Sequence, residues 1–205
     1  MRIVHNLFLS FPAIVTLTVL FFVDIILGDY EFFILINQGI INQVLDFACV
    51  YLFILLFSVS FILSIIIIYT SHKSSSKASV ILSIISGFLA YGIGSLLKVF
   101  FGRSRPFEII PTRFIGLVNT TSFSFPSTTT MLVFGLTFPI LFDKPKLGVP
   151  LVMLSFLMGF SVVYLGFHFP GDVIAGAFFS LLFSLCVDNM KPHIELFLDH
   201  YRIKK

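Results

Sequence analysis

The stretch FACVYLFILLFSVSFILSIIIIYT, residues 47–70, contains no charged side chain. A helix needs about 20 mostly apolar residues to cross a bilayer. A strand of a membrane barrel would instead alternate polar and apolar side chains over about 10 residues. This run is continuous and apolar throughout, so it predicts a membrane-spanning helix.

Similar runs on both sides of this stretch make up most of the chain. Hydrophobic residues are 58% of the 205 residues and charged residues only 11%, against about 25% charged in a soluble domain. The mean hydropathy is +1.06. These values exclude an ordinary soluble enzyme, a disordered tail and a disulfide scaffold, and they predict an all-α polytopic membrane protein with one membrane domain over residues 1–205. The six predicted spans are residues 7–27, 47–70, 78–97, 126–142, 148–168 and 171–190.

Two features predict how the chain sits in the membrane. Residues 30–45 are too short and polar to span, so we expect an amphipathic helix on the outer interface. Nine of the 13 Lys and Arg residues lie in the N-terminus, the C-terminal tail and two loops, all of which the predicted spans place on the same side of the membrane. Basic residues favour the cytoplasmic side. We therefore expect a plasma-membrane protein with both termini cytoplasmic, and residues 1–27 as an anchor rather than a cleaved signal.

Charge and cysteine content exclude several other classes of site. The net charge of +3 comes from scattered basic residues that form no stripe suited to nucleic acid. The two cysteines and five histidines show no spacing typical of a metal site. We expect membrane lipids as partners, with no nucleic acid, no metal and no cofactor.

Polar side chains from four separate segments meet in one layer at the predicted outer surface. Taken one at a time, each is more simply an interfacial anchor or a helix cap. Their arrival in a single layer favours a functional site at the outer face. In chain order they are Lys98, Arg103, Arg105, the run Ser127 to Thr130, His168 and Asp172.

These residue types suit phosphate chemistry. Cations beside a hydroxyl and the free backbone N–H groups of a helix start form a phosphate-binding cradle. His168 precedes Asp172 by four residues, with a Pro-Gly turn between them. The carboxylate would take the Nδ1 proton and leave Nε2 as the nucleophile or base. The pattern therefore predicts metal-free phosphoryl transfer through a phosphohistidine.

The same residues resemble the motifs of the type-2 phosphatidic acid phosphatase superfamily, which also contains the vanadium haloperoxidases. Its first motif, Lys, six residues and Arg-Pro, is fully matched by Lys98 with Arg105-Pro106. Its second, Pro-Ser-Gly-His, is half matched by residues 126–129, which read PSTT. Its third, Ser-Arg, five residues, His, three residues and Asp, is matched at Ser161 and by the His–Asp pair.

The resemblance covers about residues 45–190 and implies a role for each matched position. His168 would attack phosphorus in line, and Asp172 would orient it. The fold would be a six-helix membrane bundle with its site at the outer interface. The residues expected to contact substrate phosphate are Lys98, Arg103, Arg105, Ser127, Thr128 and Thr129.

Two positions depart from the family pattern. The family's general-acid histidine is Thr129 here, and its third-motif arginine is Val162. Arg103 or Arg113 is a candidate to replace that arginine. A threonine hydroxyl is too weak an acid to protonate an alkoxide leaving group, and general acid catalysis is worth roughly 10²–10⁴-fold.

The predicted function is hydrolysis of a lipid diphosphate of the isoprenoid class, such as undecaprenyl or dolichyl diphosphate. A phosphate monoester leaves without the proton that an alkoxide requires, so the loss of the acid favours a diphosphate substrate. The alternatives are a phosphatidic acid or phosphatidylglycerol phosphate phosphatase, and a non-catalytic descendant that binds lipid phosphate. A haloperoxidase fits poorly because Val162 removes an oxyanion ligand, and nothing resembles the broken-helix repeats of a transporter.

Overall fold

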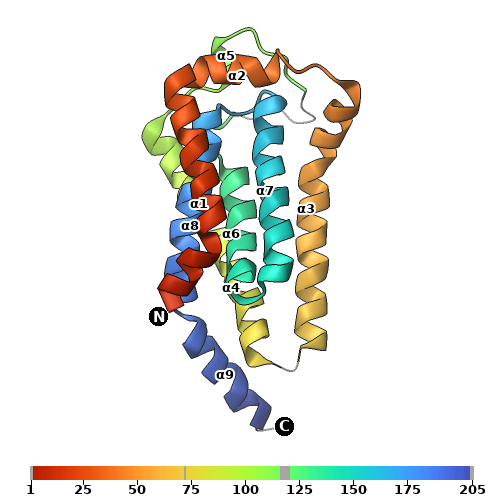
Figure 1. Cartoon of the computed structure of the whole chain (residues 1–205), viewed down its shortest axis with the longest axis vertical. Helices are drawn as coiled ribbons and strands as arrows, with labels where there is room; N and C mark the ends of the chain where they lie inside the picture. Colours follow the sequence, from red (N-terminus) through yellow and green to blue (C-terminus); the bar gives the residue numbers. More distant parts are fainter. Residues whose placement is uncertain (1, 72, 116–120, 204–205) are drawn as a thin grey trace.

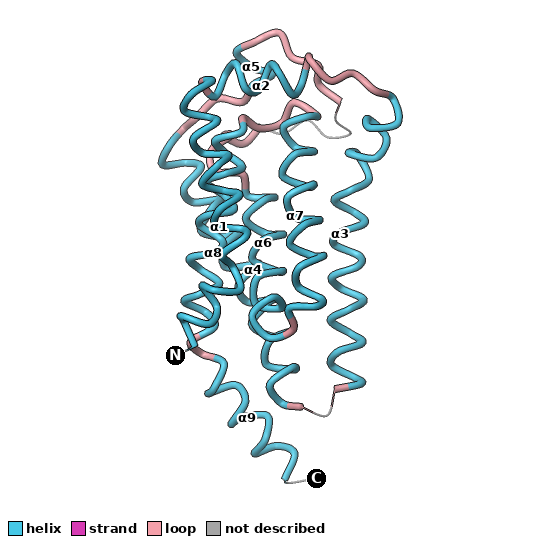
Figure 2. The backbone as a smooth tube through the Cα atoms, viewed as in Figure 1, coloured by secondary structure: helices cyan, strands magenta, loops and turns pink. Residues whose placement is uncertain are grey.

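The computed structural model describes residues 2–71, 73–115 and 121–203, and all the regular secondary structure in this part of the chain is helical (Figure 2). The helices are α1 (Arg2–Leu27), α2 (Asp29–Asn37), α3 (Gln43–Thr70), α4 (Ser74–Phe101), α5 (Pro106–Ile109), α6 (Thr128–Asp143), α7 (Pro145–Tyr164), α8 (Pro170–Asp188) and α9 (Lys191–Ile203).

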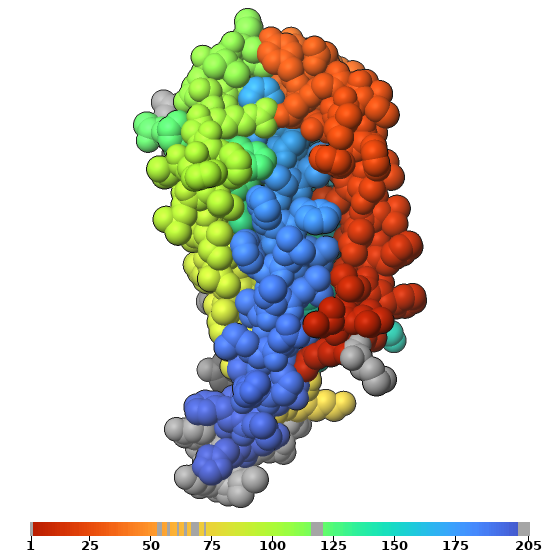
Figure 3. All heavy atoms as spheres, turned by 90° about the vertical axis from the view of Figure 1, so that its left-hand side faces the viewer, coloured from red at the N-terminus to blue at the C-terminus, as the bar shows by residue number. Residues whose placement is uncertain are grey.

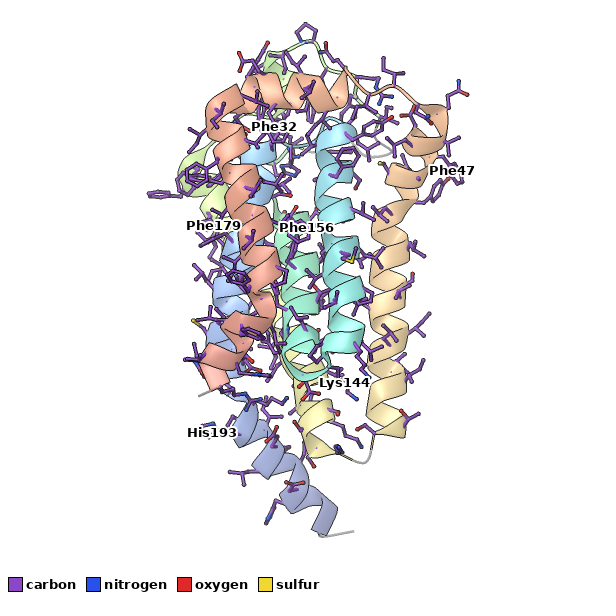
Figure 4. All side chains as sticks on the ribbon, in the orientation of Figure 1. Phe32, Phe47, Lys144, Phe156, Phe179 and His193 are labelled. Atoms are coloured by element: carbon purple, nitrogen blue, oxygen red, sulfur yellow. The ribbon has the colours of Figure 1, made fainter. Side chains whose placement is uncertain are left out.

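The long helices form a bundle whose ends differ in character. Helices α1, α3, α4, α6, α7 and α8 run along the long axis, α2 lies across one end, and α9 extends from the other (Figure 1). Both termini lie at the end opposite α2. Lys144 and His193 are also found toward that end, far from Phe32 of α2 (Figure 4). The loops that carry the predicted site residues lie at the α2 end.

Helix α6 is the centre of the bundle, and it packs against α1, α3, α4, α7 and α8. Every residue from Thr130 to Phe142 on this helix is buried. It approaches α4 very closely, since a Cβ atom on Gly135 would lie only 2.8 Å from the Cα atom of Gly87. Paired glycines allow two helix backbones to approach this closely, as in other membrane bundles.

The outer surface of the bundle is apolar, as a lipid environment requires. Large hydrophobic side chains such as Phe8, Ile26 and Phe100 are mostly exposed, and Phe47 points outward from α3 (Figure 4). Among the residues that the structure describes, four helices, α1, α4, α7 and α8, contain segments long and apolar enough to cross a membrane. The protein is therefore an all-α, multi-pass integral membrane protein with about four long apolar helices.

Several element boundaries differ from the predictions. The helix predicted over residues 30–45 ends at Asn37, and α3 already begins at Gln43. The reason is local, because the Asn42 side-chain oxygen accepts the backbone N–H groups of Val44 and Leu45 at 2.9 and 3.1 Å and so caps α3. Residues 191–203, which the sequence suggests only as a tail, form α9.

The span predicted over residues 148–168 also ends early, at Tyr164. Gly166 adopts a φ of 91°, a left-handed conformation that glycine tolerates without steric cost. The chain therefore leaves the helix before His168, and that histidine lies in the α7–α8 loop instead of at the end of the span.

Candidate active site

His168 lies at the centre of the candidate site, and its side chain is almost completely buried. The ring has polar neighbours on both nitrogens. The Nδ1 atom lies 3.5 Å from a carboxylate oxygen of Asp172 and 3.3 Å from the hydroxyl of Ser124. The Nε2 atom lies 3.4 Å from a terminal nitrogen of the Arg105 guanidinium. The structure thus brings together the predicted histidine, its carboxylate and a predicted phosphate-binding cation.

The surroundings of His168 favour a neutral ring with a free electron pair on Nε2. Burial lowers the pKa of His168 to about 4, and the positive charges of Arg105 and Lys98 act in the same direction against the opposing effect of Asp172. An arginine side chain carries only donors. Nε2 must therefore be the unprotonated nitrogen, which is the form a nucleophile or base requires.

Asp172 is fully buried in the first turn of α8. One carboxylate oxygen accepts from Arg103 at 2.7 Å. The other accepts the backbone N–H of Phe169 at 2.9 Å and the hydroxyl of Ser124 at 2.5 Å. Asp172 therefore caps its own helix and faces back toward His168.

Arg103 forms ion pairs with two carboxylates and so connects α2 to the site. Besides Asp172 it donates to Asp29, the first residue of α2, and its guanidinium stacks over the Phe169 ring at 4.3 Å. Burial alone would lower the pKa of Arg103, but the two carboxylates outweigh it and raise the pKa. Asp29 also accepts the backbone N–H of Gly171 at 2.8 Å. In this structure Arg103 thus binds the oxygen of Asp172 that does not face His168.

The other two predicted cations, Lys98 and Arg105, are buried and donate to backbone carbonyls. Lys98 donates to the carbonyls of Phe123 and Ser124 at 2.6 and 3.0 Å. Arg105 donates to the carbonyls of Ser122 and Phe167 at 2.7 and 2.9 Å. Burial lowers the pKa of Arg105, although a guanidinium stays protonated in proteins. Both side chains are held beside His168 by the segment that precedes α6.

The start of α6 completes the site. Ser127 is the N-cap of α6, its hydroxyl accepts the N–H of Thr130 at 3.4 Å, and its own N–H donates to the Asp172 carbonyl at 3.0 Å. Thr128 faces α4, with its methyl group 3.1 Å from where a Cβ on Gly94 would lie. Thr129 is half-buried in the same turn. The helix start thus lies against the start of α8, where Asp172 is.

Of the two remaining positions, Arg113 lies elsewhere, whereas the backbone carbonyl of Val162 accepts the N–H of His168 at 3.2 Å. Val162 is buried in the main hydrophobic cluster. Arg113 pairs with Asp46 at 2.7 Å and stacks over the Tyr164 ring at 4.7 Å, in a separate cluster that joins the α3 start to the α7 end. Within the described residues, no group of three His, Cys, Asp or Glu side chains is arranged to hold a metal ion.

Sequence reasoning missed two residues of this site, Ser124 and Asp29. Ser124 comes three residues before Ser127, and that proximity to the second motif is the only signal in the chain that could have singled it out. Asp29 reaches the site from 143 residues away in sequence, because α2 folds across the end of the bundle (Figure 1).

The fold and the site together define a multi-pass membrane protein with a buried His–Asp pair beside clustered cations. The chain belongs to the PAP2 superfamily, whose family model matches residues 76–192 and so includes Lys98, His168 and Asp172. It is accordingly a membrane phosphatase of that superfamily.

Two sequence relatives are undecaprenyl-diphosphatases. The chain is 28% identical over 147 residues to "Undecaprenyl-diphosphatase BcrC" of Bacillus subtilis, an alignment that spans 70% of this chain and 76% of the relative. It is 30% identical over 105 residues to an undecaprenyl-diphosphatase of Sulfolobus acidocaldarius, which spans 51% of this chain and 50% of the relative.

Two solved structures are also similar. Aquifex aeolicus LpxE superposes with a TM-score of 0.61 at 26% identity, covering 78% of this chain and 93% of that one. A PAP2-type phosphatidylglycerolphosphate phosphatase of Bacillus subtilis superposes with a TM-score of 0.62 at 20% identity, covering 90% and 96%, and so shares the fold.

Proposed function

We propose that this protein hydrolyses an isoprenoid lipid diphosphate to the lipid monophosphate through a phosphohistidine on His168. The observation that carries the proposal is the position of the His168 Nε2 atom, 3.4 Å from Arg105, while Nδ1 faces Asp172 and Ser124. A nucleophile oriented by a carboxylate and adjacent to a phosphate-binding cation is the arrangement that phosphoryl transfer needs.

In the proposed reaction, the oxygens of the terminal phosphate bind Lys98, Arg105 and the backbone N–H groups of Thr128 and Thr129 at the start of α6. The Nε2 electron pair of His168 forms a bond to that phosphorus, and the bond to the bridging oxygen breaks. The lipid monophosphate leaves with that electron pair. Water then attacks the phosphohistidine, the N–P bond breaks, its electrons return to Nε2, and inorganic phosphate departs. No step uses a metal ion.

A lateral cavity supports a lipid as the substrate. It has a volume of about 700 Å³ and lies between α1 and α8, which run side by side on the face shown in Figure 3. Its walls are mostly apolar, with Phe21, Phe22 and Phe178 among them, and its charged lining residues are Arg103, Asp24 and Asp29. A hydrocarbon chain in this cavity would place its head group next to the residues that hold Asp172.

Thr129, which stands where the family has a general-acid histidine, favours a diphosphate substrate over a monophosphate substrate. The phosphate monoester expelled from a diphosphate is a weak base and departs without a proton, whereas the alkoxide expelled from a monophosphate needs one. The undecaprenyl-diphosphatase names of two relatives agree with this preference.

The proposed topology has six spans, with α3 and α6 crossing the membrane alongside α1, α4, α7 and α8. Both termini lie in the cytoplasm and the active site lies at the outer face. The excess of Lys and Arg at the end of the bundle where both termini lie supports this orientation. A site on the outer face suits the recycling of an isoprenoid carrier released there.

The test is phosphate release by the purified full-length protein from matched isoprenoid monophosphates and diphosphates, with phosphatidic acid and phosphatidylglycerol phosphate as further substrates. We expect the diphosphate to be the best substrate and a chelator to have no effect. Better turnover of phosphatidylglycerol phosphate would replace the isoprenoid assignment. Binding of these lipids without turnover would favour the non-catalytic descendant, and loss of activity with the chelator would contradict the metal-free mechanism.

A further inference from the structure

The tautomer of His168 requires a hydrogen-bond acceptor on its Nδ1 side. Because Nε2 faces the donors of Arg105 at 3.4 Å, the ring proton of the neutral form resides on Nδ1. When Nε2 bonds to phosphorus the ring becomes cationic, and the Nδ1 proton becomes a stronger donor. Whatever accepts that proton therefore fixes the ring and stabilises the charge that develops on it.

Asp172 alone is poorly placed to be that acceptor. Its nearer oxygen lies 3.5 Å from Nδ1, farther than the Ser124 hydroxyl oxygen at 3.3 Å. The same oxygen already accepts the Phe169 N–H at 2.9 Å and the Ser124 hydroxyl at 2.5 Å. Among the contacts that join His168, Ser124, Phe169 and Asp172, the direct contact between Nδ1 and the carboxylate is thus the longest.

The Ser124 hydroxyl lies between Nδ1 of His168 and the carboxylate of Asp172. Its hydroxyl oxygen is 3.3 Å from Nδ1, and its hydrogen is committed to Asp172. A hydroxyl can donate one hydrogen bond and accept others at the same time. The contacts therefore form a chain in which Nδ1–H donates to Ser124 and Ser124 donates to Asp172.

The backbone of Ser124 is fixed on both sides by other site residues. Its N–H donates to the Arg103 carbonyl at 2.7 Å, and its carbonyl accepts from Lys98 at 3.0 Å. The residue is fully buried. The helix cap of α6 is supplied by Ser127, so the Ser124 hydroxyl is not needed for that purpose. Arg103 and Lys98 thus hold the backbone of Ser124 in a position where its hydroxyl contacts both His168 and Asp172.

We propose that Ser124 is a positioning residue for the nucleophile, linking the Nδ1–H of His168 to Asp172 through its hydroxyl. This inference rests on the proposed function. Removal of the hydroxyl leaves Lys98 and Arg105 in place, so substrate binding persists while the ring loses its closest acceptor. The effect belongs to the chemical step and appears in kcat.

The experiment compares the parent protein with Ser124→Ala on the isoprenoid diphosphate. We expect kcat to fall roughly 10–100-fold, the worth of a hydrogen bond to a charged group, with KM close to that of the parent. Ser155→Ala is the matched control, because Ser155 is equally buried but lies in the middle of α7, and it should retain the parent kcat.

Two further variants keep the test decisive if Ser124→Ala is not recovered folded. Ser124→Cys preserves the volume but bonds weakly, and it should lose kcat as the alanine variant does. Ser124→Thr restores a hydroxyl and should exceed Ser124→Cys in kcat. Parent-like kcat in Ser124→Cys, or a loss confined to KM, would overturn the role of Ser124 while leaving phosphatase activity intact. Absence of turnover in the parent protein would instead reject the proposed function.

Discussion

The Nε2 atom of His168 and the guanidinium of Arg105 lie 3.4 Å apart, so nucleophile and phosphate ligand are neighbours before any substrate arrives. The two residues are 63 positions apart in sequence and come from the loops before α5 and α8. A phosphate oxygen bound to Arg105 is therefore delivered within reach of the attacking nitrogen. Such preorganisation lowers the cost of bringing the reacting groups together.

Replacement of the nucleophile should abolish the reaction. We expect His168→Ala to release no phosphate above background, and Asp172→Asn to release it much more slowly, because the ring remains but loses its anionic partner. The measurement is the initial rate of phosphate release in detergent. His193→Ala is the control, since His193 is exposed at the opposite end of the bundle (Figure 4). Full activity in His168→Ala would reject the phosphohistidine mechanism.

The proposed binding of phosphate by Arg105 and Lys98 is tested by replacing each residue. Loss of a donor that stabilises charge growing in the transition state costs on the order of 3–4 kcal/mol, or roughly 10²–10³-fold in kcat. Arg105→Ala and Lys98→Ala should each show a loss of this size, and the exposed Lys146→Ala should show none. Near-normal kcat in Arg105→Ala would identify another arginine as the ligand.

Thr129 decides between the two kinds of leaving group. Thr129→His should raise kcat/KM for a lipid monophosphate more than for the matching diphosphate, because only the alkoxide route lacks a proton donor worth roughly 10²–10⁴-fold. The double change with Thr128→Gly gives the new ring more room. The measurement is the ratio of the two kcat/KM values before and after substitution. Equal hydrolysis of both lipids by the parent protein would contradict the leaving-group argument.

The pH profile follows from the burial of His168. The neutral ring attacks, and its pKa is lowered from 6.5 to about 4. Activity should therefore persist at pH 5, where an exposed histidine would be mostly protonated, and fall as the pH drops through about 4. The acid limb of kcat/KM reports this ionisation after correction for the ionisation of the substrate, measured separately. A limb centred near 6.5 would mean that the ring is solvated in the free enzyme.

The orientation in the membrane is tested by cysteine labelling. In a background with Cys49 and Cys186 replaced by alanine, Pro111→Cys places a thiol on the exposed loop near Arg113. An impermeant reagent should label it on intact cells, and should label Lys146→Cys only after the cells are opened. The reverse pattern would place the site in the cytoplasm.

The helical class could be predicted from the sequence for physical reasons, and so could the placement of Arg105, His168 and Asp172 next to one another. Uninterrupted apolar runs permit few structures in a bilayer, and residues at span ends share a depth once the spans are counted. Ser124 and Asp29 could not be predicted from the sequence, because their positions next to Asp172 depend on where α2 and the segment before α6 fold. The early end of α7 depends on the conformation of Gly166, which a run of apolar letters does not reveal.

The carbonyls that receive Lys98 and Arg105 have a consequence for product release. When inorganic phosphate leaves, both cations already have alternative acceptors at 2.6–3.0 Å on the segment 122–124 and on Phe167. An incoming anion must displace those contacts, so part of the free energy of binding phosphate is spent on breaking hydrogen bonds that the two cations already make. Inorganic phosphate should consequently be a weak competitor, and the enzyme should keep turning over as its product accumulates around it.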